Sequence, residues 1–144
     1  MRKYLLFSFV SSLLLFAFPS QAEQKVLLGD YEVHYMALNS TFIPAEVAKV
    51  YQLERSRYKG LINITVLDAK AKGKPALAVK ISGTAQNLIG NQNQLEFQEV
   101  REGDSVYYLA QLRFSNEETF RFEILIGEGP KQQRLKFNHK FYVE

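Results

Sequence analysis

Apolar residues recur at every second position through most of this chain beyond residue 22. In an extended strand, such alternation puts apolar side chains on one face and polar side chains on the other, so it predicts half-buried β-strands. Clusters of Gly, Pro, Asn, Asp and Ser separate the alternating runs and are typical of turns. The pattern predicts about seven strands, at residues 25–38, 58–68, 76–86, 94–101, 105–114, 118–127 and 133–143.

One segment between the first two predicted strands departs from the alternation. Pro44 suits the first turn of a helix, and Val47, Val50 and Tyr51 follow at helical spacing, which predicts one short helix. Regularly spaced strands with so little helix favour two packed sheets. We therefore expect an all-β, two-sheet sandwich of immunoglobulin-like or transthyretin-like type, with one short helix after the first strand.

The first 22 residues have the pattern of a cleaved secretory signal. Arg2 and Lys3 precede an apolar run over residues 5–18, and Ser20-Gln21-Ala22 is a small-x-small end suited to signal peptidase. The apolar run is about 14 residues long, shorter than the roughly 20 that span a bilayer. We expect residues 1–22 to be removed and residues 23–144 to form a single β-sandwich domain in the periplasm, not embedded in the membrane.

The composition excludes several kinds of chemistry. The chain has no cysteine, which excludes disulfides, thiol nucleophiles and thiolate metal sites. It has 18 basic and 15 acidic residues, and removal of Arg2 and Lys3 with the signal leaves 16 against 15. That near-neutral balance argues against nucleic acid as a partner, because nucleic-acid binding requires a concentrated basic surface.

Several segments, taken in order, resemble a known family. They are GDYEVHY (29–35), NSTF (39–42), RSR (55–57), NITV (63–66), SGT (82–84), EFQEVREGD (96–104) and SNEET (115–119). This ordered set spans nearly the whole exported chain and resembles the domain of unknown function 4426 family of small exported gamma-proteobacterial β proteins. The resemblance implies a periplasmic β protein of Gram-negative bacteria. The family has no established activity, so the resemblance assigns no functional residues.

The two histidines, His34 and His139, are the candidate ligands for a metal ion, together with Asp30. Along one strand, Asp30 and His34 would lie about 13 Å apart at roughly 3.3 Å per residue, too far to share an ion. His139 alternates with Phe137 and Phe141, which favours a partly buried, hydrogen-bonded histidine. We therefore expect no metal and no other cofactor.

The long connection between the first two predicted strands is the candidate binding region. Functional residues on β-sandwiches often lie on such connections, and arginines suit an anionic ligand. The candidate binding residues are Asn39, Ser40, Thr41, Arg55, Arg57 and Tyr58. Alternatively, the connection is a cap over the open end of the core, because it carries the apolar residues Phe42, Ile43, Val47, Val50 and Tyr51, which need burial.

The sequence contains no recognisable catalytic motif. It has no G-x-S-x-G elbow, no H-E-x-x-H pair and no glycine-rich phosphate loop. We therefore expect a non-enzymatic binding or protein-interaction module whose partner is an unidentified periplasmic protein or small ligand. Two alternatives stay open: a small periplasmic hydrolase with a site assembled from loops, and a chaperone or inhibitor that pairs through an edge strand.

The signal sequence leads to the first prediction. Cleavage after Ala22 should make Glu23 the first residue of the exported protein, because the small-x-small end lies at residues 20–22. Intact-mass analysis of protein recovered from the periplasm measures this directly. Full-length protein in the membrane fraction would contradict it.

Overall fold

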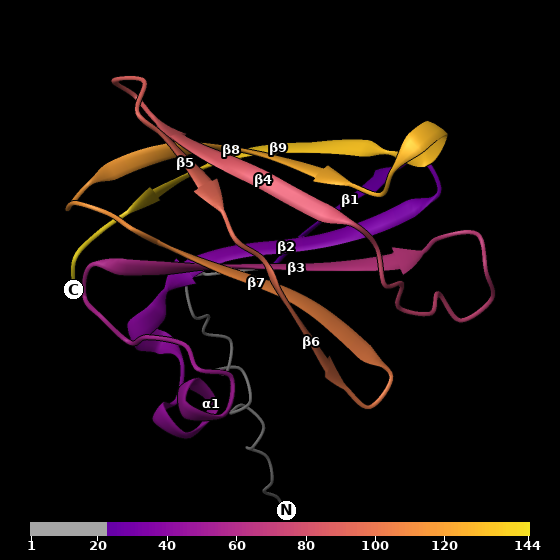
Figure 1. Ribbon diagram of the computed structural model, residues 1–144, viewed down its shortest axis with the longest axis horizontal. Helices are drawn as coiled ribbons and strands as arrows, with labels where there is room; N and C mark the ends of the chain where they lie inside the picture. The colour runs from indigo at the N-terminus through magenta and orange to yellow at the C-terminus, as the bar shows by residue number, and fades with distance from the viewer. Residues whose placement is uncertain (1–22) are drawn as a thin grey trace, which may run out of the picture.

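The computed structural model describes residues 23–144 as two antiparallel β-sheets packed face to face (Figure 1). The five-stranded sheet contains, in spatial order, β1 (Gln24–Leu28), β2 (Tyr31–Asn39), β3 (Lys59–Asp68), β7 (Ser105–Arg113) and β6 (Gln98–Glu102). The four-stranded sheet contains β5 (Gln92–Leu95), β4 (Ile81–Asn87), β8 (Glu118–Ile126) and β9 (Gln133–Phe141). The all-β, two-sheet sandwich predicted from the alternation is thus confirmed.

Short helices occupy two connections. The 3-10 helix η2 (Ser40–Phe42) and the α-helix α1 (Ala45–Val50) follow β2, and the 3-10 helix η3 (Gly129–Lys131) links β8 to β9. The short helix predicted near residue 44 is confirmed, although it follows the second strand rather than the first. Within residues 23–144, no helix is both long and apolar enough to cross a bilayer. The predicted signal at residues 1–22 lies outside the described residues.

The described residues form nine strands rather than the expected seven, because two predicted strands are each divided. The range 25–38 is a hairpin in which Leu28 pairs with Tyr31 across a turn of Gly29 and Asp30. Gly29 has a φ of 59°, which favours glycine and suits the first position of a tight hairpin turn. The Gly-Asp pair is a hairpin signal that could have been found in the sequence.

The second division lies in the predicted strand at 94–101. Leu95 pairs with Gly83 in one sheet, whereas Gln98 pairs with Leu109 in the other, so the chain crosses between sheets at residues 96 and 97. Leu95 and Phe97 both pack on the central core. The alternation therefore continues across the break, because it reports which side chains are buried and not which strand they pair with.

The predicted strand at 76–86 begins later than expected. Leu77 and Val79 pack on the core, yet β4 starts only at Ile81. Leu77 donates its backbone N–H to Val66, and the Val79 N–H is bonded to the Tyr108 hydroxyl at 2.7 Å. This segment therefore crosses between the sheets, and its alternation again reflects burial without continuous strand pairing.

The core between the sheets contains a continuous row of aromatic rings. Tyr35 contacts Phe137, which stacks on Phe122 with ring centroids 4.8 Å apart. Phe122 lies 6.1 Å from Phe120, which contacts Phe141 edge to face. The row lies between the two sheets, contains side chains from both, and joins strands that are far apart in the sequence.

Phe122→Ala should lower the free energy of unfolding by about 3 to 5 kcal/mol. Phe122 is 1% exposed and contacts two other rings, so truncation leaves a cavity in the middle of the row. Urea unfolding followed by circular dichroism gives the value. Phe42→Ala is the matched control: Phe42 is 52% exposed, and we expect a loss below about 1 kcal/mol. Equal losses for the two variants would contradict the assigned core.

Candidate functional site

The connection between β2 and β3 lies against the outer face of the five-stranded sheet, where it builds a second, smaller core. We call residues 40–58 the excursion. Its buried Ile43 and Ala48 pack with three residues of the sheet, Leu61, Val100 and Leu109. The excursion therefore covers the outer face of the five-stranded sheet (Figure 1). The hypothesis that it caps the open end of the central core is wrong.

The excursion buries fewer apolar side chains than the sequence predicts. The helix turns Ala48 inward, while Val47 and Val50 are exposed and Tyr51 is half-buried. Phe42 is also exposed. The cap hypothesis would bury Phe42, Val47 and Val50, but all three are exposed, because a six-residue helix presents only a narrow face to the sheet.

Two of the candidate binding residues, Asn39 and Ser40, are buried and bonded inside the protein. Asn39 is 6% exposed and donates its side-chain amide to the Tyr142 carbonyl at 2.8 Å. The fully buried Ser40 hydroxyl donates to the Ser56 carbonyl at 3.0 Å and accepts from the Ser56 N–H at 2.9 Å. These two side chains hold the two ends of the excursion and the C-terminal segment together.

The other four candidates lie at or near the surface. Arg55 donates to the carbonyls of Ile43 and Thr41, at 2.7 and 3.2 Å, and Arg57 donates to the Glu144 carbonyl at 3.0 Å. Both arginines are exposed, so each keeps part of its guanidinium open to solvent while it binds backbone. Tyr58 is 45% exposed, and Thr41 is half-buried.

Exposed apolar side chains gather around these residues. We call them the excursion patch: Phe42, Val47, Val50, Tyr58 and Tyr142. Their exposed fractions run from 40% at Val47 to 71% at Val50. Tyr142 joins the set because Asn39 and Arg57 bind the C-terminal segment beside the excursion. Of the patch, only Tyr58 belongs to the predicted binding residues.

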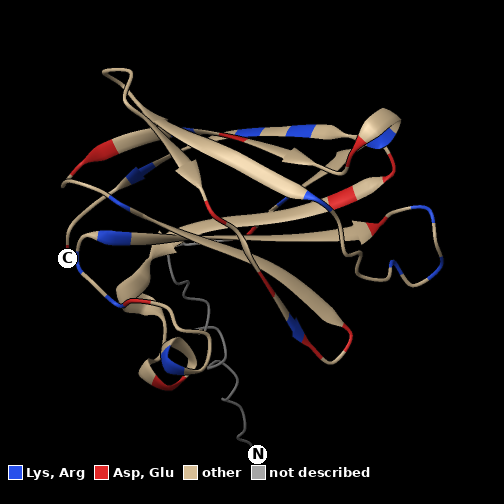
Figure 2. Ribbon diagram, in the orientation of Figure 1, with Lys and Arg blue, Asp and Glu red and all other residues tan. Residues whose placement is uncertain are grey.

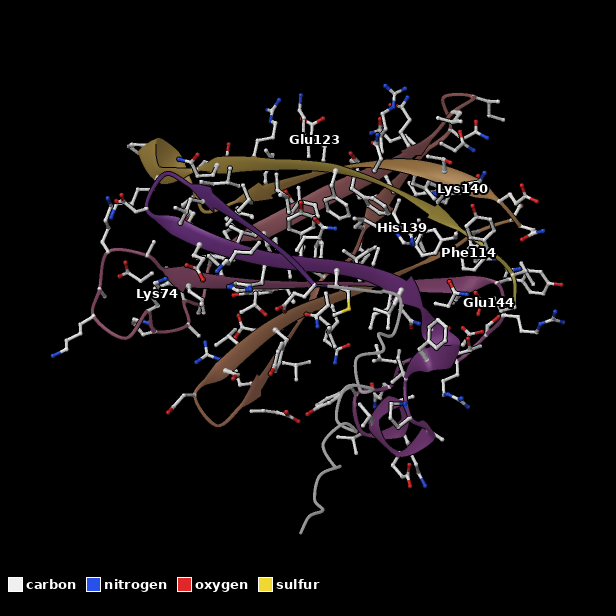
Figure 3. All side chains as sticks on the ribbon, turned by 180° about the vertical axis from the view of Figure 1, so that it is seen from behind. Lys74, Phe114, Glu123, His139, Lys140 and Glu144 are labelled. Carbon is white, nitrogen blue, oxygen red and sulfur yellow. The ribbon has the colours of Figure 1, made fainter. Side chains whose placement is uncertain are left out.

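The structure does not bring the two histidines together. His34 is next to the buried Val33 in β2, so it points to the outer face of the five-stranded sheet, where its Nε2 lies 2.8 Å from Glu32 Oε2. His139, labelled in Figure 3, is half-buried and packs edge to face on Phe141, with the ring centroids 4.5 Å apart. Burial lowers the pKa of His139. Residues 23–144 contain no group of three or more His, Asp or Glu side chains arranged to hold a metal ion.

Glu32 is a buried carboxylate that the sequence analysis did not single out. It is 6% exposed and accepts from Lys74 Nζ at 2.9 Å and from His34. Lys74 comes from the lysine-bearing connection between β3 and β4 and has a φ of 44°, in the left-handed region that non-glycine residues seldom adopt (Figure 2). The ion pair therefore fixes an otherwise unfavourable turn against the sheet.

A cleft of about 700 Å³ lies at the end of the sandwich where the β1–β2, β3–β4 and β8–β9 connections meet. Its charged lining residues are Asp30, Asp68, Lys70 and Lys131. Asp68 uses Oδ1 to accept from the backbone N–H groups of Lys70 and Ala71. No site was predicted here from the sequence, because the lining residues come from three separate connections. Neither histidine lines this cleft, nor does any serine or threonine.

Glu32→Gln should flatten the loss of stability in acid. The Lys74 ammonium and then His34 hold the pKa of Glu32 at about 2, below its usual 4.5. A depressed carboxylate pKa stabilises the folded state fully above pH 4.5, and that contribution is lost as pH falls toward 2. Urea unfolding at a series of pH values between these limits measures the slope.

Glu46→Gln, at an exposed position on α1, is the matched control and should keep the wild-type slope. A Glu32→Gln profile that falls as steeply as the wild type would show that Glu32 is not the responsible group.

Comparison with known proteins shows which families and structures resemble this one. The model of the family described as Domain of unknown function (DUF4426) matches residues 25–144. A crystal structure of a DUF4426 family protein from Pseudomonas aeruginosa PAO1 superposes with a TM-score of 0.75 and 35% identity, covering 86% of this chain and 98% of that one. A search of curated protein sequences gives no match.

More distant similarity extends to FetP of uropathogenic Escherichia coli strain F11. A copper-bound variant superposes with a TM-score of 0.57 and 13% identity, over 85% of this chain and 92% of that one. FetP as isolated after recombinant expression in the E. coli periplasm gives the same score and identity, with 95% of that chain covered. At this identity the likeness concerns the fold alone. The family match and the 35% identical structure together show that this chain belongs to the DUF4426 family.

Proposed function

We propose that this protein is a non-enzymatic protein-interaction module of the periplasm and that it binds its partner through the excursion patch. The observation that carries the proposal is the exposure of four large apolar side chains on the excursion, and of Tyr142 on the C-terminal segment that is hydrogen-bonded to Asn39 and Arg57. Aromatic residues and arginine dominate the binding energy of protein interfaces. Arg57 directly precedes Tyr58, Arg55 binds the carbonyls of the two residues that flank Phe42, and both arginines are exposed.

The patch rests on a rigid support, which lowers the entropy cost of binding. Ser40 and Ser56 tie the two ends of the excursion together through two hydrogen bonds. Gln111 of β7 exchanges a further pair of hydrogen bonds with the backbone of Glu54, at 2.8 and 3.0 Å. Beneath the excursion, the second core anchors Ile43 and Ala48 on the sheet. Such a surface favours a partner that docks on a preformed shape.

The two alternatives, a hydrolase and a chaperone or inhibitor that pairs through an edge strand, have less support. A hydrolase of the serine–histidine type would need its nucleophile and base in one cleft, and the 700 Å³ cleft contains neither a serine nor a histidine. Strand addition needs an open edge. The longest edge strand, β9, carries Arg134, Lys136 and Lys140, and charged side chains of this kind oppose edge pairing.

The copper in the FetP variant is a property of that protein, and the likeness at 13% identity extends only to the fold. In this chain, His34 is engaged with Glu32, and His139 packs on Phe141. The described residues therefore give no reason to extend the proposal to a metal-dependent function.

A photo-crosslinking residue, benzoylphenylalanine, introduced in place of Tyr58 should capture one discrete periplasmic protein in living cells. Introduced in place of Leu27, an exposed apolar residue on β1, it should not. Adding Phe42→Ser to the Tyr58 variant should lower the crosslinked yield about tenfold, because hot-spot losses of about 1.4 kcal/mol or more are usual. Thermal melts check that both proteins remain folded. The same captured set from both positions, or none from position 58, would refute the proposal.

A further inference from the structure

The turn between β4 and β5 presents two aliphatic side chains to solvent. Leu88 is 69% exposed and Ile89 is 82% exposed, the largest exposed fraction among the large apolar residues of the described chain. Burying a branched aliphatic side chain stabilises a protein relative to leaving it in water. Soluble proteins therefore rarely place two such side chains next to each other at a protruding tip. Figure 1 shows this tip rising from the corner of the four-stranded sheet.

The tip is held in one conformation by its own hydrogen bonds. Asn87 is buried: its side-chain oxygen accepts from the Asn91 N–H at 2.8 Å, and its amide donates to Glu118 at 2.9 Å. The Asn87 N–H also donates to the Asn91 carbonyl, and Gly90 has a φ of 94° that a side chain would disfavour. Leu88 and Ile89 are therefore displayed on a firm support and are not part of a loose loop.

The outer face of the same sheet is basic. On β8 and β9, the residues that alternate with the buried core residues are exposed or half-buried, and four of them are Arg121, Arg134, Lys136 and Lys140. The one acidic residue among them, Glu123, pairs with Arg134 at 2.9 Å. Arg121 and Lys136 form no ion pair within residues 23–144. They line a shallow depression of about 300 Å³ together with polar residues of β4 and β5.

The charge of the described protein is thus divided between its surfaces. The outward side chains of β8 and β9 include four basic and one acidic residue, a net charge of +3, and one of the four, Lys140, lies 3.8 Å from Glu117 of the β7–β8 turn. The remaining described residues carry 12 basic and 14 acidic side chains, a net charge of −2. Figure 2 shows the basic bands along β9. In Figure 3, Glu123 lies on the upper side of the sheet, which is also the side toward which the β4–β5 tip projects.

We propose that this surface docks on an anionic lipid membrane, with Leu88 and Ile89 inserted among the acyl chains and the basic face against the headgroups. Apolar insertion combined with electrostatic attraction is the way in which peripheral proteins bind anionic bilayers. A convex aliphatic tip beside a flat basic sheet suits a bilayer, because lipids open around a protruding side chain, whereas a protein partner would need a matching pocket. An acidic protein or polymer would bind the basic face without contacting Leu88 and Ile89 at the tip.

The proposed membrane surface and the excursion lie on opposite sides of the sandwich, and they meet at one edge, where Lys140 Nζ lies 5.4 Å from the centroid of the Tyr142 ring. The tip and basic residues belong to the four-stranded sheet, whereas the excursion covers the outer face of the five-stranded sheet. A bilayer docked on the four-stranded sheet therefore leaves the excursion itself, with Phe42, Val47 and Val50, on the far side of the sandwich. The lipid proposal does not depend on the excursion patch, and the two can be tested separately.

The test is co-sedimentation of residues 23–144 with vesicles of phosphatidylcholine, with and without 40% phosphatidylglycerol. We expect binding only to the anionic vesicles, and weaker binding at high salt because screening shortens the reach of the charges. Leu88→Ser with Ile89→Ser should weaken binding by about tenfold or more. Arg121→Gln with Lys136→Gln should weaken it by about fivefold for each charge removed.

Matched controls separate these contacts from general effects. Lys70→Gln with Lys72→Gln removes the same charge from the β3–β4 connection and should change binding less than about twofold. Phe42→Ser with Tyr58→Ser, in the excursion patch, should leave vesicle binding intact. The lipid assignment is overturned by equal binding to neutral vesicles, by no binding at all, or by an unaffected tip variant. Binding to polyglutamate that depends on the basic residues but not on the tip would identify an acidic polymer instead.

Discussion

The contact between Phe141 and Gly60 determines how this sandwich closes. Phe141, in the last strand, is fully buried and stacks on Phe114 with ring centroids 4.7 Å apart and an angle of 13° between the rings. Its ring edge faces Gly60 of β3, in the opposite sheet, where a Cβ atom would lie only 2.5 Å from Phe141 Cε1. The glycine makes the room that the ring needs. Through this contact the C-terminal strand is fixed against the first residues of β3, the middle strand of the five-stranded sheet, and the aromatic row is completed.

Because the aromatic row supplies the packing between the sheets, the two outer faces are free to differ. The outer face of the five-stranded sheet is partly covered by the excursion and its small core around Ile43 and Leu61. Within residues 23–144, the outer face of the four-stranded sheet has no such cover and carries charged and amide side chains instead. A cysteine-free chain can support this division because its stability comes from the interior.

At the candidate site, residue type alone does not distinguish a side chain that binds a ligand from one that stabilises the fold. Asn39 and Ser40 were selected as polar residues in a long connection, but the structure buries both and uses their polar atoms to fix the excursion. Buried polar groups must be hydrogen-bonded, so an Asn-Ser pair at the end of a strand is as consistent with a structural bond as with a ligand contact. Arg55 and Arg57 were selected for their charge, and both donate to main-chain oxygens, those of Ile43 and Glu144. Tyr58 is the candidate that best suits a binding role, since its side chain is exposed.

The sequence by itself determined the fold class, the position of the helix and most strands of the sandwich, because alternation and turn residues report local burial and local geometry. It also determined the family, through an ordered set of segments spread over the chain. Only the tertiary structure decided which strands pair. At Leu95 and Phe97 the alternation runs unbroken while the chain changes sheets.

The tertiary structure also decided where functional surfaces lie. Leu88 and Ile89 are unremarkable apolar residues in the sequence, and only their place at a hairpin tip leaves them in solvent. Likewise, Arg121 and Lys136 lie 15 positions apart in the sequence and become neighbours because β8 and β9 pair. Exposure and proximity depend on packing between distant segments, and a local pattern carries no information about that packing.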